Sequence, residues 1–238
     1  MYMEKKLKTI GLIGGMSWES TVTYYQVINE TVKDRLGGLH SAKILLYSVD
    51  FAEIERFQSE GKWSECASIL GRAAYRLEQA GADFIVICTN TMHKVANQVA
   101  NCVDIPLLHI AEATGSVLKA ERVSKVLLLG TKYTMQQDFY KQKLLEAGIE
   151  VVIPDEKGVA FVNSIIYDEL CRGIISDVSR KKLIDLCLNI QQKNDIQGII
   201  LGCTEIGLLL KQEDLPSCKV FDTTLIHARR AALFSLNV

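Results

Sequence analysis

Two short motifs in this chain combine side chains that can transfer protons with hydroxyl and amide groups that can bind a substrate. Residues 88–91 read Cys-Thr-Asn-Thr, and residues 202–205 read Gly-Cys-Thr-Glu. Each motif follows a short apolar run, so each is expected at the end of a buried strand. A reaction that removes a proton from one side of a substrate and adds one to the other needs an acid and a base, and two such strand ends can supply them.

Cys203 lies where a thiol would be activated. The apolar run 198–201 precedes it, and residues 204–208 read as the entry to a helix. A thiol at a helix start meets unpaired backbone N–H groups and the positive end of the helix dipole, and both favour thiolate. We therefore expect the thiolate form of Cys203 to be favoured. The cysteines outside the two motifs are expected to be small core residues: Cys66, Cys102, Cys171, Cys187 and Cys218.

The two motifs occupy matching places in what read as two copies of one α/β unit. Buried strands are expected at the apolar runs 8–13, 43–49, 105–109, 125–129, 148–153, 198–201 and 219–222, and before the first motif. Helical periodicity covers residues 64–80, 162–170 and 179–192. Unbroken apolar strands that alternate with helices indicate parallel sheets covered on both faces.

We therefore predict an α/β fold of two pseudo-symmetric lobes, each a four-stranded parallel sheet flanked by helices. The first lobe comprises residues 1–113 and is completed by a C-terminal helix over 224–238, and the second comprises residues 114–223. Ligands of such sheets bind at the carboxyl ends of the strands, where both motifs fall. The active site is expected in the cleft between the lobes.

Composition excludes some classes of partner. A chain of 238 residues with 48% hydrophobic residues and a net charge of −1 can bury a sizeable core, but it has no basic footprint for nucleic acid or an anionic membrane. No apolar run approaches the length of a transmembrane helix. Seven cysteines without a regular framework favour a reducing, cytoplasmic compartment. Without a Cys-x-x-Cys pair, and with its four histidines far apart in sequence, the chain is expected to bind no metal.

The chain resembles the aspartate/glutamate racemase family, specifically its bacterial branch of broad-specificity or L-aspartate/glutamate-specific amino-acid racemases. The resemblance rests on residues 14–21 (Gly-Gly-Met-Ser-Trp-Glu-Ser-Thr), 88–93 and 202–206, and it extends to residues 221–227. It implies a cofactor-independent isomerase of D-amino acid metabolism, active without pyridoxal phosphate and commonly a homodimer. In such enzymes two residues flank the substrate Cα.

In most relatives both of these residues are cysteines, the first within Cys-Asn-Thr and the second within Gly-Cys-Thr. Cys203 matches the second, whereas Thr89 occupies the first position. Cys88 lies one residue earlier and offers a rival alignment, but neighbouring side chains on a strand point to opposite faces. Because Thr89 keeps the register with the following Asn-Thr, we favour Thr89 as the catalytic position, with Cys88 packed behind it.

A threonine hydroxyl can donate or relay a proton but is a far weaker base than a thiolate. The hypothesis is therefore asymmetric: Cys203 removes the α-proton, by resemblance from the L enantiomer, and Thr89, with or without a water, reprotonates the opposite face. Backbone N–H groups of the turns after the two strands are expected to stabilise the carboxylate of the carbanion.

The candidates for substrate binding are Met16, Ser17, Gln58, Asn90, Thr91, Thr131, Thr204 and Glu205. Some have structural alternatives. Thr91 and Thr204 could simply cap helices, and Glu205 could be a first-turn carboxylate favoured by the helix dipole rather than a group that orients the thiol or the substrate ammonium.

The preferred amino acid stays open between aspartate, glutamate and a broader set. An acidic substrate requires a cation in the pocket, for which Arg56 and Lys132 are candidates. If neither side chain reaches the pocket, neutral amino acids are the favoured substrates. Other cofactor-free enzymes of similar arrangement are alternatives, namely maleate isomerase, hydantoin racemase and malonate decarboxylase types. From a different class, a non-catalytic amino-acid-binding protein would bind a ligand without exchanging its α-proton.

Overall fold

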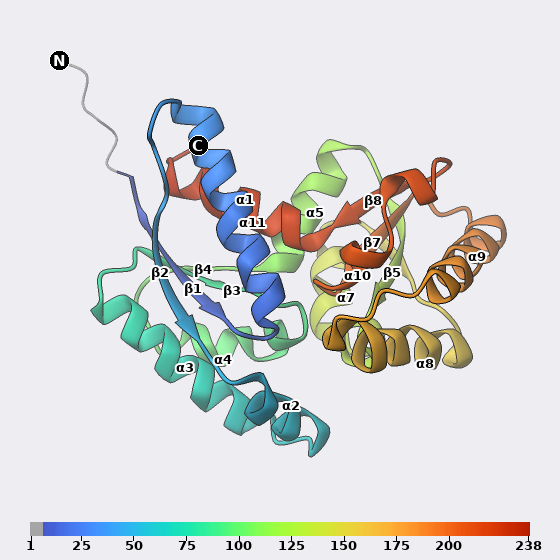
Figure 1. The fold of residues 1–238 in the computed structure, drawn as a ribbon, viewed down its shortest axis with the longest axis horizontal. Coiled ribbons are helices and arrows are strands. Elements are labelled where there is room, and N and C mark those ends of the chain that lie inside the picture. Colours follow the sequence, from blue (N-terminus) through green and yellow to red (C-terminus); the bar gives the residue numbers. More distant parts are fainter. Residues whose placement is uncertain (1–6) are drawn as a thin grey trace. The chain divides into compact units, whose positions relative to one another are not determined.

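The computed structural model describes residues 7–238, so the first six residues of the expected first lobe lie outside it. The chain divides into two compact units (Figure 1). Unit 1 contains residues 7–110 together with His227–Val238, and unit 2 contains Ala111–Ile226. Each unit is described by itself.

Unit 1 is built on a parallel sheet in the order β2-β1-β3-β4. Its elements in chain order are β1 (Thr9–Gly14), α1 (Trp18–Leu36), β2 (Lys43–Ser48), α2 (Phe51–Ser59), α3 (Trp63–Gln79), β3 (Phe84–Ile87), a 3-10 helix (Thr91–Val95), α4 (Ala96–Ala100) and β4 (Leu107–Leu108). The unit also holds the start of α5 (Ile110–Ala120) and most of α11 (Thr223–Ser235).

Helices cover both faces of this sheet (Figure 1). On one face, side chains of β1 and β3 such as Ile13 and Ile87 pack with Leu70 of α3 in one apolar cluster. On the other face Phe84 of β3 makes an edge contact with Phe234 of α11, with ring centroids 4.8 Å apart. Burial on both faces explains why β3 is an unbroken apolar run.

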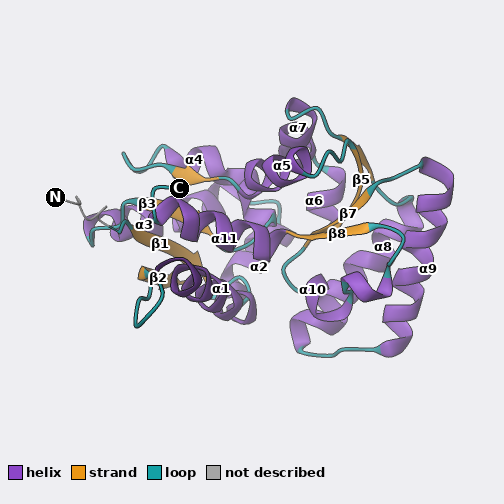
Figure 2. Cartoon of the chain, turned by 90° about the horizontal axis from the view of Figure 1, so that it is seen from above, coloured by secondary structure: helices purple, strands orange, loops and turns teal. Residues whose placement is uncertain are grey.

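Unit 2 repeats the plan, with a parallel sheet in the order β6-β5-β7-β8. Its elements are β5 (Lys125–Gly130), α6 (Lys132–Gln136), α7 (Asp138–Glu146), β6 (Glu150–Val152), α8 (Glu156–Ser164), a π-helix (Ile165–Glu169), a 3-10 helix (Leu170–Arg172), α9 (Asp177–Asn194), β7 (Gly198–Gly202), α10 (Ile206–Leu209), a 3-10 helix (Gln212–Asp214) and β8 (Lys219–Asp222). Figure 2 shows the strands of unit 2 with α5 and α7 on one side and α8 to α10 on the other.

The predicted α/β class and the two four-stranded parallel sheets are confirmed. The helix expected over 162–170 is wrong in its bounds, because α8 ends at Ser164 and the chain continues as a π-helix. The sequence pattern does not separate these two forms, since Val162, Ile165 and Leu170 all remain in the core of unit 2. Among the described residues, no helix is both long and apolar enough to cross a membrane.

Candidate active site

The first half-site lies at the carboxyl ends of β1 and β3 in unit 1. Ile13 pairs with Ile87, and the backbone N–H of Cys88 donates to the Ile13 carbonyl at 2.9 Å, so the pairing continues one residue beyond β3. Cys88 therefore lies opposite Gly14, and its side chain is fully buried. Thr89, one residue further, is buried to all but 9% of its surface.

The loop after β1 is held tightly against the start of α1. The Thr21 hydroxyl accepts from the Gly15 N–H at 2.8 Å and donates to the Ser17 carbonyl at 2.9 Å. Gly15 has φ +88°, and a Cβ there would lie 2.2 Å from the Val49 carbonyl oxygen, so only glycine fits. The loop fixes the buried Met16 and Ser17, two predicted substrate-binding residues, next to the strand end.

Three other predicted residues lie in or against the turn that follows Thr89. Asn90 and Thr91 are both buried, and Asn90, not Thr91, is the N-cap of the 3-10 helix. The alternative in which Thr91 caps the helix is therefore wrong. The Gln58 amide on α2 donates to the Met92 sulfur at 2.9 Å, so Gln58 packs against the same turn.

His93 contacts the backbone of Thr89. Its Nδ1 donates to the Thr89 carbonyl at 2.8 Å, and its Nε2 accepts from the Ile110 N–H at 3.2 Å, which defines the neutral tautomer. Burial and the neighbouring His109 hold the pKa of His93 well below its ordinary value. The ring centroids of His109 and His227 lie 4.6 and 5.6 Å from that of His93. Sequence reasoning missed this cluster because its members are far apart along the chain.

The second half-site lies at the carboxyl ends of β5 and β7 in unit 2. Gly130 and Gly202 are paired in register, and a Cβ on Gly130 would lie 2.8 Å from the Gly202 carbonyl oxygen. The two glycines thus let the strand ends approach closely. Thr131 then caps α6, its Oγ1 accepting from the Thr134 N–H at 3.3 Å.

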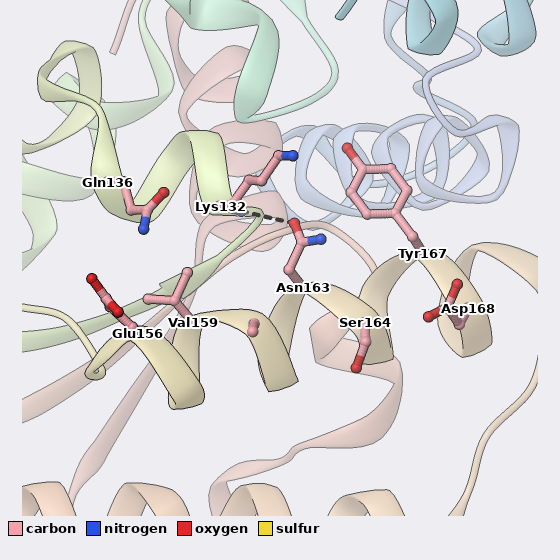
Figure 3. Close-up of a pocket in the computed structure, with 9 residues that line it drawn as sticks. Lys132, Gln136, Glu156, Val159, Asn163, Ser164, Tyr167 and Asp168 are labelled. Carbon is pink, nitrogen blue, oxygen red and sulfur yellow. Dashed lines mark hydrogen bonds between the residues drawn. The ribbon is translucent and has the colours of Figure 1, made fainter. Parts of the chain in front are cut away.

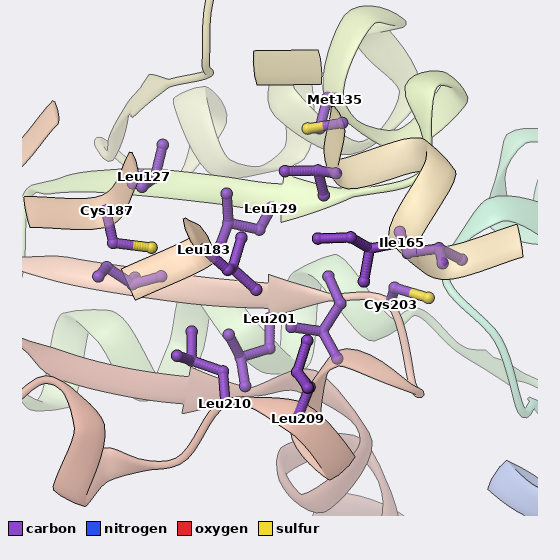
Figure 4. Packing of buried hydrophobic residues seen from close by; sticks show 14 of the residues in the cluster. Leu127, Leu129, Met135, Ile165, Leu183, Cys187, Leu201, Cys203, Leu209 and Leu210 are labelled. Carbon is purple, nitrogen blue, oxygen red and sulfur yellow. The ribbon is translucent and has the colours of Figure 1, made fainter. Parts of the chain in front are cut away.

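Cys203 follows Gly202 directly and is 7% exposed, at the edge of the hydrophobic core of unit 2 (Figure 4). Its Sγ donates to Oε2 of Glu205 at 3.0 Å, and the Thr204 hydroxyl donates to the same oxygen at 2.7 Å. Thr204 therefore contacts the Glu205 carboxylate and does not cap α10, whose N-cap is Glu205.

The expected thiolate at Cys203 is wrong for this arrangement. Burial and the Glu205 carboxylate raise the pKa of the Cys203 thiol well above its ordinary value. The helix that should favour thiolate is only four residues long, and a full negative charge in hydrogen-bond contact outweighs its partial charge.

Strand pairing places the two half-sites at equivalent positions in their sheets. β1 and β5 each have six residues and the same burial pattern, and they end at Gly14 and Gly130. Cys88 lies opposite Gly14 as Gly202 lies opposite Gly130. The residue that follows is Thr89 in unit 1 and Cys203 in unit 2.

The two cations considered for an acidic substrate have different surroundings. Lys132 lines a pocket of about 370 Å³ in unit 2, where its backbone N–H donates to Asn163 at 2.9 Å. Figure 3 shows the Lys132 ammonium and the Tyr167 hydroxyl at the same end of this pocket. In unit 1 the Arg56 guanidinium lies 4.8 Å from the centroid of the Phe57 ring. In the part of the chain that the structure describes, no three His, Cys, Asp or Glu side chains are grouped to hold a metal ion.

Comparison with known proteins agrees with this two-unit fold. Residues 13–231 match the family model of the Asp/Glu/hydantoin racemases. The chain therefore belongs to this family and is an isomerase, a pyridoxal-phosphate-independent amino-acid racemase.

Individual relatives support the assignment. The broad-specificity amino-acid racemase RacX of Bacillus subtilis is 26% identical over 222 residues, which cover 87% of this chain and 90% of RacX. A crystal structure from Yersinia pestis, provisionally assigned as an Asp/Glu racemase, is 53% identical with a TM-score of 0.90, covering 96% of this chain and 99% of the other. An aspartate racemase homologue from Pyrococcus horikoshii is 37% identical with a TM-score of 0.83, at the same coverage of 96% and 99%.

Proposed function

We propose that this protein racemises amino acids with Cys203 and Thr89 as its two proton-transferring residues. The observation that carries the proposal is the sheet register, which makes Thr89 the counterpart of Cys203 and leaves Cys88 opposite a strand-end glycine. Full burial of Cys88, whose Sγ lies 3.9 Å from the Val86 carbonyl oxygen, also supports Thr89 over Cys88.

The proposed chemistry is directional. Cys203 removes the α-proton from the L enantiomer, and the Thr89 hydroxyl, with or without a water, donates to the opposite face of the carbanion. Starting from the D enantiomer, Thr89 would have to act as a base, which a hydroxyl does poorly. The proposal therefore requires turnover at saturating substrate to be faster from L to D than from D to L, whereas kcat/KM is equal for the two enantiomers because their equilibrium constant is one.

We propose aspartate, glutamate or a broader set that includes them as substrates. By the resemblance to the family, a glutamate after Gly-Cys-Thr, here Glu205, is typical of aspartate-type members. The Bacillus relative is named for broad specificity. Backbone N–H groups of the turns after Thr89 and Cys203 would bind the substrate carboxylate, and Lys132 or Arg56 would bind an acidic side chain.

The test is Cα hydrogen-to-deuterium exchange in D2O, followed by NMR for a panel of L and D amino acids. Cys203→Ala and Thr89→Ala should each abolish racemisation, whereas Cys88→Ala, a change of the same size one residue away, should preserve it. Comparable turnover from the two enantiomers at saturating substrate would overturn the directional mechanism, and loss of activity in Cys88→Ala with retention in Thr89→Ala would overturn the assignment of Thr89.

Two further parts of the proposal are a cytoplasmic location and a homodimer. Seven free cysteines support a reducing compartment. The homodimer rests on the resemblance to the racemase family, and light scattering after size-exclusion chromatography tests it.

A further inference from the structure

His93 is the buried side chain that bonds to the backbone of Thr89, the residue to which we assign proton donation. It lies four residues after Thr89 on the 3-10 helix Thr91–Val95, and only 3% of its surface is exposed. Its Nδ1 donates to the Thr89 carbonyl oxygen at 2.8 Å. Backbone pairing between β1 and β3 extends as far as the N–H of Cys88, so this carbonyl lies beyond the paired part of the sheet. The ring therefore holds a segment that strand pairing does not hold.

The other ring nitrogen of His93 is bonded to a different element. Its Nε2 accepts from the backbone N–H of Ile110, the first residue of α5, at 3.2 Å. The first N–H groups of a helix have no partner within the helix, so this bond also satisfies a helix start. The ring thus joins the Thr89 carbonyl to the start of α5, and each of its nitrogens has a separate task.

Neighbouring rings restrict the orientation of His93. The ring centroids of His109 and His227 lie 4.6 and 5.6 Å from that of His93, at interplanar angles of 61° and 68°. Side chains in a close-packed interior have little freedom to turn. His93 can therefore hold the Thr89 carbonyl in one position.

We propose that His93 is a positioning residue of the racemase, whose bond to the Thr89 carbonyl sets the direction of the Thr89 hydroxyl and thereby the rate at which the carbanion is protonated from that side. This proposal rests on the proposed function, in which Thr89 and Cys203 transfer the protons. In this role His93 transfers no proton and acts only through Thr89.

The path from the carbonyl to the hydroxyl of Thr89 is short. A threonine side chain branches at Cβ and is stiff about χ1, so the orientation of its backbone largely sets the direction of its hydroxyl. Rotation of the peptide unit that follows Thr89 would therefore displace the hydroxyl. A displacement of about 1 Å in a catalytic group can cost about a hundredfold in rate. One hydrogen bond to this carbonyl is thus enough to control proton donation.

A purely structural role for His93 leads to a different expectation. If the ring only filled space and satisfied two backbone groups, loss of either bond would lower stability and reduce the amount of active protein. Both fates of the carbanion, protonation by Cys203 and protonation by Thr89, would then fall together. A positioning role affects protonation by Thr89 alone.

The experiment follows the carbanion formed in D2O from the L amino acid that the wild-type protein racemises fastest. Protonation by Cys203 returns the L enantiomer, which acquires deuterium from the exchanged thiol, whereas protonation by Thr89 yields the D enantiomer. Chiral chromatography at early times gives the D product, and mass spectrometry gives the deuterium in the recovered L substrate. The ratio of D product to deuterated L substrate does not depend on the amount of folded protein.

Three variants at position 93 separate the two hydrogen bonds. In His93→Asn the amide nitrogen can take the place of Nδ1 and keep the bond to Thr89. In His93→Gln the longer side chain can take the place of Nε2 and keep the bond to Ile110, and His93→Phe keeps the volume of a ring and removes both bonds. The ratio should fall by up to about a hundredfold in His93→Gln and in His93→Phe, either of which suffices if the other does not fold. It should stay close to the wild-type value in His93→Asn.

Two further variants calibrate the ratio. Thr89→Ala lacks the hydroxyl and sets its lower limit. His227→Gln is the matched control, because His227 is equally buried and contacts the His93 ring, but its own nitrogens bond to Tyr24 and Leu108. His227→Gln should lower the free energy of unfolding and leave the ratio unchanged.

An unchanged ratio in His93→Gln and His93→Phe would overturn the proposal. So would a fall of the same size in His93→Asn or in His227→Gln, because the ratio would then follow the packing of the cluster and not the bond to Thr89. If Thr89→Ala keeps the wild-type ratio, or if the wild-type protein racemises no amino acid, the proposed function fails and the role of His93 fails with it.

Discussion

Lowering the pH should destabilise unit 1 through the buried His227. Its Nδ1 accepts from the Tyr24 hydroxyl at 2.8 Å, and its Nε2 donates to the Leu108 carbonyl at 3.0 Å, so the neutral ring satisfies both of its nitrogens. Burial and the neighbouring His93 lower the pKa of His227 from 6.5 to about 3.

The sign of the effect follows from this lowered pKa. Below its usual value of 6.5 the unfolded chain binds a proton at His227, whereas the folded chain binds it only near pH 3. The stability contributed by the neutral ring is therefore complete above that usual value and is lost as the pH falls, by about 1.4 kcal/mol for each pH unit. At about pH 4.5 the loss from this one residue is about 2.7 kcal/mol. His93, whose pKa is also lowered by burial, adds a loss of the same sign.

Urea unfolding of the wild-type protein and of His227→Gln, at neutral pH and at about pH 4.5, measures this loss. Both tryptophans, Trp18 and Trp63, belong to unit 1, so tryptophan fluorescence reports on its unfolding. Glutamine does not titrate. Between the two pH values, the free energy of unfolding of His227→Gln should therefore fall by about 2.7 kcal/mol less than that of the wild type. His40→Gln, at an exposed position, should follow the wild type. An equal loss in wild type and His227→Gln would refute the reasoning.

Further predictions concern the half-sites and the surface. Thr89→Cys should raise D-to-L turnover at saturating substrate by roughly a hundredfold or more, because a thiol replaces a weak base, and no gain in exchange from D substrates would count against Thr89 facing the substrate. Cys88→Ser should leave the ratio of the two initial rates unchanged in the same assay. Gly202→Ala should destabilise the protein by about 1–3 kcal/mol in urea unfolding and slow exchange, because the new Cβ would lie 2.8 Å from a carbonyl oxygen of β5. Lys219→Ala should leave the midpoint of thermal unfolding unchanged, since the ion pair of Lys219 with Glu121 is exposed to solvent.

Strands buried on both faces could be predicted closely from the sequence. The run 198–201 differs from β7 only by one terminal glycine, because an unbroken apolar run fits a parallel strand covered on both sides. The bounds of the partly buried strands were predicted less accurately. The run 105–109 contains only the two strand residues Leu107–Leu108, and the run 148–153 contains only Glu150–Val152, because partial burial leaves a less distinct apolar pattern.

The chemistry of the strand ends was harder to predict. Sequence places Cys203 after a strand and before a helix, but it does not give the length of α10 or the rotamer of Glu205. Burial of the thiol and the Glu205 carboxylate, 3.0 Å from Sγ, raise the pKa of Cys203, and the four-residue α10 does not offset them. The histidine cluster around His93 was missed for a different reason, because only the packing of β4 and α11 against the Thr91–Val95 turn brings its members together.

The two half-sites share one backbone arrangement but differ in charge. This difference is relevant to the relative rates of L-to-D and D-to-L conversion. In unit 1 the neutral His93 donates from Nδ1 to the backbone carbonyl of Thr89. This bond does not involve the Thr89 hydroxyl, which is the group with a transferable proton. Beside Cys203 is the Glu205 carboxylate, whose Oε2 accepts a hydrogen bond from the thiol. A pair of equivalent thiols would serve the two enantiomers alike, whereas the proposed mechanism assigns proton removal to unit 2 and proton donation to unit 1. We therefore expect Thr89→Cys to supply a second thiol, so that D-to-L turnover at saturating substrate rises towards L-to-D turnover.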